Sequence, residues 1–442
     1  MSVRKASSTL TLTAPVPPLI EREAPAAERS FEALDWQGSV RLAADRALGL
    51  SAPRFQQHVR TGLLERALSL GADHREGPHT ERPEVARRLL AHVDALAEAG
   101  LSFEGIEAFS AEAEVDSAGA LWTLTLLFGC LDLPGAEEAF TRWIGTLDEA
   151  LLVVYGGVVE IADALAMQPS AQIRVGAASW LGGPSALLAA VAMEMLAVEP
   201  ISGEALARLG RREEPLVVVA FERLLTRSPV DARRPRSGGD SWVDIGAPAL
   251  AYEIVKARIL AQDFDSLIQV RQRDARALGA LGPYAIDVLA LAGDATDAGI
   301  AREIVLGLPT TPGLLDAMGR AGLPALFPRL LAATEDDELD DEAHAALETA
   351  LGPTTARPSR AAWEQGIAAL PRSDAPARFR GGKLHTAASV LEEMGRPSLS
   401  ASDLRRRADE LFVRSGKRLS PAWDALGVPL SGALSELARL AR

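Results

Sequence analysis

The chain contains one cysteine, Cys130, among its 442 residues. No intramolecular disulfide is possible, so the fold makes no use of an oxidising compartment. Cys130 lies in the apolar run 126–131, where we expect a buried and unreactive thiol. Aromatic residues are also scarce, at 5%. Alanine, leucine and arginine take their place, and this composition favours helices that approach one another closely.

Long apolar runs are missing too. A membrane-spanning helix needs about 18 apolar residues, and the run that comes nearest, 187–198, is interrupted by Glu194. Residues 1–30 lack the apolar centre of a secretory signal peptide. We therefore expect a soluble, cytoplasmic protein with no membrane partner.

Positive charge is the scarcer sign. Lys and Arg number 46 against 60 Asp and Glu, which gives a formal net charge of −14, and the only lysines are Lys5, Lys256, Lys383 and Lys417. A nucleic-acid-binding protein needs a basic face to neutralise phosphates. No long basic face is visible in the sequence, so we expect no nucleic-acid partner.

A glycine turn that recurs between apolar segments is the most informative feature present. Gly293, Gly322 and Gly352 each separate two such segments, at spacings of 29 and 30 residues, and Gly182 and Gly210 lie 28 residues apart. A period near 30 built from helix, turn and helix is typical of an α-solenoid. Each hairpin buries its apolar face only by stacking on its neighbours, so the repeats must come in series.

The hairpin after Gly322 has the clearest pattern. Its second helix carries apolar residues at i, i+3, i+4, i+7 and i+8, which define one buried face: Leu323, Leu326, Phe327, Leu330 and Leu331. Pro328 is costly deep inside a helix, which places the helix start, or a kink, near it. No segment shows the period-2 alternation of a half-buried strand, so we expect an all-α protein without a sheet.

The composition along the chain predicts four regions. They are a disordered tail at 1–30, an N-terminal helical module at 31–110, a repeat array at 111–353 interrupted by a loop at 227–240, and a helical C-terminal cap at 354–442. Within the N-terminal module, residues 71–81 are expected to form a polar loop.

These turns resemble those of the PBS-lyase-type HEAT-like repeats of bacteria. The matching stretches are LAGD at 291–294, DAMGRAGLPALFPRLL at 316–331 and AHAALETALGP at 343–353. The stretches at 87–100 and 377–394 resemble the beginning and end of an uncharacterised bacterial HEAT-repeat family. The resemblance implies a helical-repeat fold. Some genes of that kind are associated with type VI secretion clusters, and the resemblance carries over no catalytic residue.

Several groups contain residue types found in metal or phosphate sites, but the residues around them do not complete such a site. His74 and His79 share a predicted loop, but no cysteine or carboxylate set completes a zinc site. The acidic run 335–342 lacks the spacing of a calcium loop, and we expect Thr334 to cap a helix that begins within it. Gly381-Gly382-Lys383 lacks the first glycine and the Ser or Thr of a phosphate-binding loop.

Four residues form the candidate interaction surface. Arg233, Arg234 and Arg236 belong to the predicted loop at 227–240, where they are able to contact an acidic partner. Trp242 follows that loop and is the candidate interface anchor. The other tryptophans are expected to pack in the core.

Repeat architecture without a catalytic constellation predicts a non-enzymatic scaffold or adaptor for a protein partner, with no cofactor and no metal. One alternative is a lyase-like or enzyme-accessory solenoid that binds a small molecule or a modified protein. Another is a DNA-binding HEAT-like solenoid, which the acidic charge disfavours.

Overall fold

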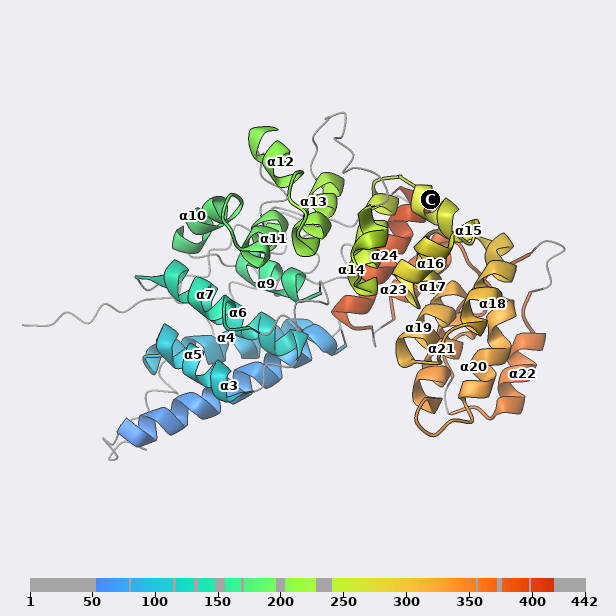
Figure 1. Ribbon diagram of the computed structural model, residues 1–442. Coiled ribbons are helices and arrows are strands. Elements are labelled where there is room, and N and C mark those ends of the chain that lie inside the picture. The colour runs from blue at the N-terminus through green and yellow to red at the C-terminus, as the bar shows by residue number, and fades with distance from the viewer. Residues whose placement is uncertain are drawn as a thin grey trace, which may run out of the picture. The chain divides into compact units, whose positions relative to one another are not determined.

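The chain is predominantly helical in the computed structural model (Figure 1). The structure describes residues 53–78, 81–113, 117–130, 134–147, 156–167, 171–195, 203–227, 241–354, 357–371, 376–396 and 399–416. The prediction of a helical protein is confirmed. The expectation of no sheet is wrong in one detail, because strands β1 (Phe379–Arg380) and β2 (Lys383–Leu384) form an antiparallel hairpin in which Phe379 faces Leu384. The predicted tail at 1–30 and almost all of the predicted loop at 227–240 lie outside the described residues.

Backbone contacts divide the helices into two compact units. In unit 1 one row of helices, α3, α6, α9 and α11, packs in that order, and α5, α7 and α10 pack in series as a second row. Its helices are α3 (Pro53–Glu76), α4 (Arg82–Glu98), α5 (Phe103–Glu112), α6 (Ala118–Cys130), α7 (Ala136–Ile144), α9 (Gly156–Met167), α10 (Ala171–Trp180), α11 (Ala186–Met195) and α12 (Gly203–Leu209).

A close helix crossing organises unit 1. A Cβ atom on Gly119 of α6 would lie 2.5 Å from the Cα atom of Ala72 on α3, and one on Gly71 would lie 1.6 Å from Thr123 Oγ1. The predicted polar loop at 71–81 is therefore wrong over its first six residues. Although their composition is typical of a loop, α3 continues to Glu76, because its glycine and alanine let it pack tightly on α6.

Aromatic rings fill the core of unit 1. Phe128 stacks on Phe103 and on Trp143, with ring centroids 5.6 and 5.0 Å apart. Cys130 ends the same helix and is buried, as predicted, and burial raises the pKa of its thiol to about 12. Four tryptophans that were assigned to the core have described side chains, and all four are buried, which confirms that assignment: Trp122, Trp143, Trp180 and Trp363.

We predict that Gly119→Ala destabilises the protein by about 1–3 kcal/mol, since the added methyl group meets the backbone of α3 and forces the helices apart. Gly62→Ala is the matched control on α3, where a Cβ atom would meet nothing within 4 Å. It should stabilise the helix by roughly 0.5–1 kcal/mol. Urea denaturation of the full chain measures both, and equal effects of the two substitutions would contradict the close crossing.

Unit 2 repeats the two-row packing with shorter helices. Its first row, α13, α14, α17, α19 and α21, packs in series, and α15, α16, α18 and α20 pack along it. Its helices are α13 (Pro215–Arg227), α14 (Pro248–Leu260), α15 (Asp265–Arg271), α16 (Ala275–Leu281), α17 (Tyr284–Ala292), α18 (Ala298–Leu306), α19 (Pro312–Ala321), α20 (Phe327–Ala333), α21 (Asp340–Leu351), α22 (Arg360–Ala368), α23 (Ala387–Met394) and α24 (Ala401–Ser415), the last belonging to this unit from Asp403 onward.

The hairpin after Gly322 follows its sequence pattern closely. Gly322 ends α19 in the left-handed conformation, at φ +61°. Pro328 lies in the first turn of α20, after a short 3-10 turn at Pro324–Leu326. All five residues of the predicted apolar face are buried. The expected cap is wrong, since Thr334 ends α20 and its hydroxyl donates to the carbonyl of Leu331.

Among the described helices, none is long and apolar enough to span a membrane by itself. The helices α16 and α17 reach the required length and apolarity only when counted together, and they meet at 101°.

Candidate functional site

Residues 376–384, here called the strap, cross the C-terminal ends of three consecutive first-row helices of unit 2. These are the ends of α17, α19 and α21, which carry the recurring glycines Gly293, Gly322 and Gly352. The last carbonyl groups of a helix have no partner within the helix. The strap supplies donors to them.

One guanidinium group serves two of these helix ends. Arg378 donates to the carbonyl oxygens of Ala290 and Gly293 at the end of α17, at 2.9 and 2.5 Å, and of Ala321 at the end of α19, at 2.6 Å. Its side chain is buried, and burial lowers its pKa to about 9. The negative end of each helix dipole compensates its charge.

The strap backbone continues the same pattern. The amide of Phe379 donates to the carbonyl of Gly322 at 2.8 Å, and the amides of Gly381 and Gly382 donate to Thr349 and Ala350 near the end of α21, each at 2.9 Å. A Cβ atom on Gly322 would lie 2.0 Å from the carbonyl oxygen of Phe379. Glycine at this turn is therefore required both by its positive φ and by the passage of the strap.

A buried ionic cluster locks the strap to α23 and α24. Arg380 contacts Glu393 at 3.0 Å and Glu410 at 2.7 Å, and Arg407 contacts Glu393 at 3.0 Å. His385 Nε2 lies 2.8 Å from Glu410 Oε1. Burial opposes the charge of Glu410, but Arg380, His385 and Arg414 outweigh it and hold the pKa of Glu410 well below its usual value.

Burial has the dominant effect on the imidazole of the cluster. It lowers the pKa of His385 to about 3. His385 is consequently neutral at physiological pH, and its Nε2 atom lies beside the ionised Glu410.

Helix α24 lies across the first row of unit 2. Charged residues recur along that row, and two of them form ion pairs with α24. Lys256 on α14 contacts Asp409 at 2.7 Å, and Asp316 on α19 contacts Arg406 at 2.9 Å. Between them, Asp287 on α17 pairs with Arg320. Positions 256, 287 and 316 are 31 and 29 residues apart, close to the spacing of Gly293, Gly322 and Gly352. Burial opposes the charge of Asp316, but Arg320, Arg406 and Arg407 together lower its pKa.

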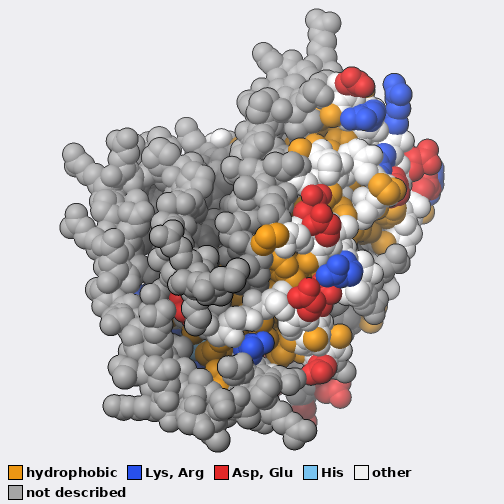
Figure 2. All heavy atoms as spheres, turned by 90° about the vertical axis from the view of Figure 1, so that its left-hand side faces the viewer, with side chains coloured by type: hydrophobic (Ala, Val, Ile, Leu, Met, Phe, Trp, Pro, Cys, Tyr) orange, Lys and Arg blue, Asp and Glu red, His pale blue; other side chains and the backbone are white. Residues whose placement is uncertain are grey.

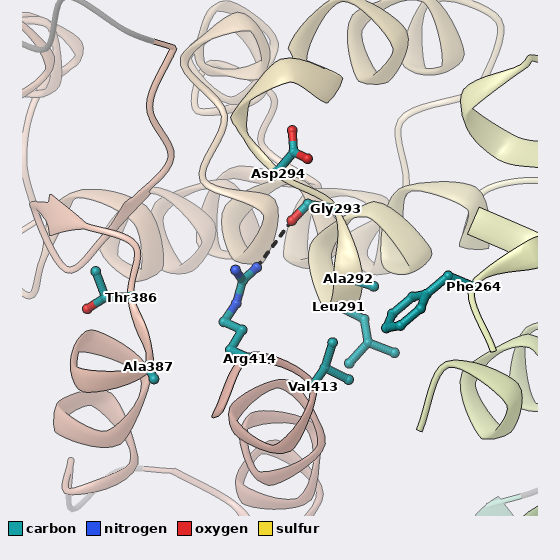
Figure 3. A pocket seen from close by; sticks show the side chains of 9 residues that line it. All are labelled: Phe264, Leu291, Ala292, Gly293, Asp294, Thr386, Ala387, Val413 and Arg414. Carbon is teal, nitrogen blue, oxygen red and sulfur yellow. Dashed lines mark hydrogen bonds between the residues drawn. The ribbon is translucent and has the colours of Figure 1, made fainter. Parts of the chain in front are cut away.

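A pocket of about 380 Å³ lies between the turn at Gly293 and the helices α23 and α24 (Figure 3). Its lining combines apolar side chains with a cation and a carboxylate. The residues are Phe264, Leu291, Ala292, Gly293, Asp294, Thr386, Ala387, Val413 and Arg414.

Of the four residues of the predicted interaction surface, the structure describes only Trp242. Arg233, Arg234 and Arg236 lie outside the described residues. Trp242 is fully buried in a 3-10 turn (Ser241–Asp244) that packs on α14 and α16. Its indole ring is thus a core group and offers no exposed anchor, because the adjoining helices cover it.

The other candidate groups from the sequence that the structure describes belong to helices or turns of the fold. His74 lies on α3 and stacks on Trp122, with centroids 5.1 Å apart, while His79 lies outside the described residues. Gly381 and Gly382 form the tight turn between β1 and β2, both at positive φ. Asp340, Asp341 and Glu342 occupy the first turn of α21, as the helix dipole favours. No group of three potential metal ligands occurs in the described part of the chain.

Comparison with protein-family models, with curated proteins and with solved structures finds no match to this chain.

We predict that Gly322→Ala releases the strap, since the added methyl group displaces Phe379. Gly246→Ala is the matched control. Gly246 also has a positive φ, +71°, but a Cβ atom there would meet nothing within 4 Å, so its cost is the backbone strain alone, about 1 kcal/mol. Hydrogen exchange should show faster exchange of the Phe379 amide in the first variant and an unchanged rate in the control. Unchanged exchange in both variants would count against strap docking.

The ionic cluster also predicts acid lability. Because the folded pKa of His385, about 3, lies below its usual 6.5, the unfolded chain binds one more proton between those values. Stability then falls as pH falls through this window, by about 1.4 kcal/mol per pH unit and proton. The depressed pKa of Glu410 acts in the same direction at lower pH.

His385→Gln removes this titration and keeps a donor toward Glu410. Denaturation midpoints measured from about pH 4 to 8 should show a shallower slope below pH 6.5 in the variant and parallel curves above pH 7. Identical slopes throughout would show that His385 titrates normally in the folded protein.

Proposed function

We propose that the protein is a non-enzymatic scaffold, a HEAT-like α-solenoid that holds a protein partner on its stacked helices. Serial packing of helices within each unit supports this proposal. So does the recurrence of glycine turns and charged positions at about 30 residues in unit 2. An array of this kind presents an extended surface of similar positions, which suits binding of a polypeptide better than chemistry at one point.

The observation that carries the proposal is the way in which unit 2 binds its own C-terminal segment. The helix ends hold an extended strand through backbone carbonyl groups. The first row holds a helix through charged pairs at repeat-related positions. These are two of the general modes by which proteins recognise peptides, an extended backbone and a docked helix.

The DNA-binding alternative has less support. In the part of the face that is described in Figure 2, acidic and basic side chains alternate in small groups with hydrophobic side chains between them, and no extended basic patch covers it. Together with the net charge of −14, this arrangement is unsuited to a phosphate backbone.

We expect affinity purification of the tagged full chain from its native host to recover a protein that rebinds the purified chain in a defined stoichiometry. The resemblance directs the search first to proteins of type VI secretion clusters. Cross-links from the reconstituted partner should reach at least two consecutive hairpins of one unit, because a solenoid uses successive repeats. Light scattering after gel filtration measures the stoichiometry.

Two results would overturn the proposal. One is turnover of a metabolite by the purified chain that a single polar substitution abolishes. The other is a partner whose cross-links reach only residues outside the helical hairpins. A useful control is Arg357→Glu, because Arg357 is exposed and pairs with Asp340 and Asp341 outside the strap and ionic cluster. The Arg357→Glu variant should still bind a partner that is held by the cross-linked hairpins.

A further inference from the structure

The pocket beside the strap has two chemically distinct sides. Phe264, Leu291 and Val413 form an apolar side, and Thr386 with Ala387 lies opposite (Figure 3). Arg414 stands between the two sides, with its guanidinium group directed toward Gly293. All these residues belong to unit 2.

Arg414 is a cation whose contacts with its neighbours are long. Its Nη2 atom lies 3.4 Å from the carbonyl oxygen of Gly293, and its Nε atom lies 3.5 Å from Glu410, both long contacts for a guanidinium group. Glu410 is shared with Arg380 and His385. The side chain of Arg414 is 20% exposed, so part of it reaches the pocket while the rest is removed from water.

The opposite side of the pocket also favours negative charge. Thr386 and Ala387 begin α23, and the hydroxyl of Thr386 caps this helix by accepting from Ser389. Ser389 in turn accepts from the amide of Thr386, so the start of α23 offers an anion its partial positive charge and the remaining amides of its first turn. An anion between Arg414 and the start of α23 would therefore meet favourable potential from two directions.

Asp294 offsets this potential only in part, although its charge acts on Arg414. Its carboxylate accepts from Thr296 at 2.8 Å and contacts Arg271 at 2.8 Å, so its charge is already compensated. It is 57% exposed at the rim of the pocket. It remains able to accept a hydrogen bond from an ammonium or amide group of a ligand.

We propose that this pocket binds an α-carboxylate that carries an apolar side chain, either a free amino acid or the last residue of a peptide. The carboxylate contacts Arg414 and the start of α23, and the side chain lies against Phe264, Leu291 and Val413. A volume of about 380 Å³ is at the small end of ligand pockets and suits one residue. The inference does not depend on the scaffold proposal.

The test is a calorimetric titration of the full chain with L-leucine, N-acetyl-L-leucine and N-acetyl-L-leucinamide. We expect the two carboxylates to bind at least tenfold more tightly than the amide, because only they form the charge-assisted contact to Arg414. Tighter binding of L-leucine identifies a free amino acid as the ligand. Tighter binding of N-acetyl-L-leucine identifies a peptide terminus.

Two variants separate the parts of the pocket. Arg414→Gln should weaken carboxylate binding at least tenfold. Ala292→Phe fills the apolar side, keeps the cation and should also abolish binding. Arg357→Gln, which removes an exposed arginine outside the pocket lining, is the matched control and should bind as the wild type does.

The proposal is overturned if neither carboxylate binds the wild-type chain at about 10 mM, or if the amide binds equally well. It is also overturned if Arg414→Gln retains wild-type affinity. Thermal melts establish that each variant is folded, and if Arg414→Gln is not, retained binding by Ala292→Phe rejects the proposal on its own.

Discussion

The arrangement of unit 2 depends on one interaction, the contact of the Arg378 guanidinium group with the carbonyl ends of two helices. Helix C-termini that end side by side expose several unpaired acceptors and negative dipole ends to one another. The guanidinium group has five donors in a planar fork and stays charged when it is buried. With this fork Arg378 satisfies Ala290, Gly293 and Ala321 at once. The strap must therefore pass close to the backbone, and glycine follows at Gly322.

The ionic cluster around Arg380 fixes where the strap lies more than how stable it is. Burying ion pairs costs desolvation energy that their attraction offsets only when the geometry is good, so their net contribution to stability is small. A misplaced strap would leave Arg380 buried without its two carboxylates and would remove one cation from Glu393 and from Glu410, at a cost of several kcal/mol. The charges thus penalise every other register of the strap. Lys256 and Asp316 do the same for α24, since their opposite signs match Asp409 and Arg406 in one orientation only.

Sequence patterns predicted those parts of the fold that local chemistry decides. The buried face from Leu323 to Leu331, the start of α20 near Pro328 and the burial of Cys130 follow from periodicity and propensity. The failures have tertiary causes. Residues after Gly71 are typical of a loop, yet the close packing of α3 on α6 keeps them helical. The strap was missed because its partners are remote: Arg378 and Ala290 are 88 residues apart. The only signal in the sequence was Arg378-Phe379-Arg380-Gly381-Gly382, two arginines before a pair of glycines. This pattern does not indicate which carbonyl groups accept from the strap.

Occupation of the helix ends by the strap restricts where unit 2 is able to bind another molecule. The carbonyl groups at the ends of α17, α19 and α21 that receive strap donors are already engaged, so a second extended chain would compete with the strap for them. Lys256 and Asp316 of the first row are likewise engaged by α24. What the docked segment creates in exchange is an edge, at which Arg414 of α24 and the start of α23 meet the turn at Gly293. The glycine turn at Gly293 therefore does more than connect two helices, because residues of α23 and α24 that lie against it complete a pocket with apolar and charged sides.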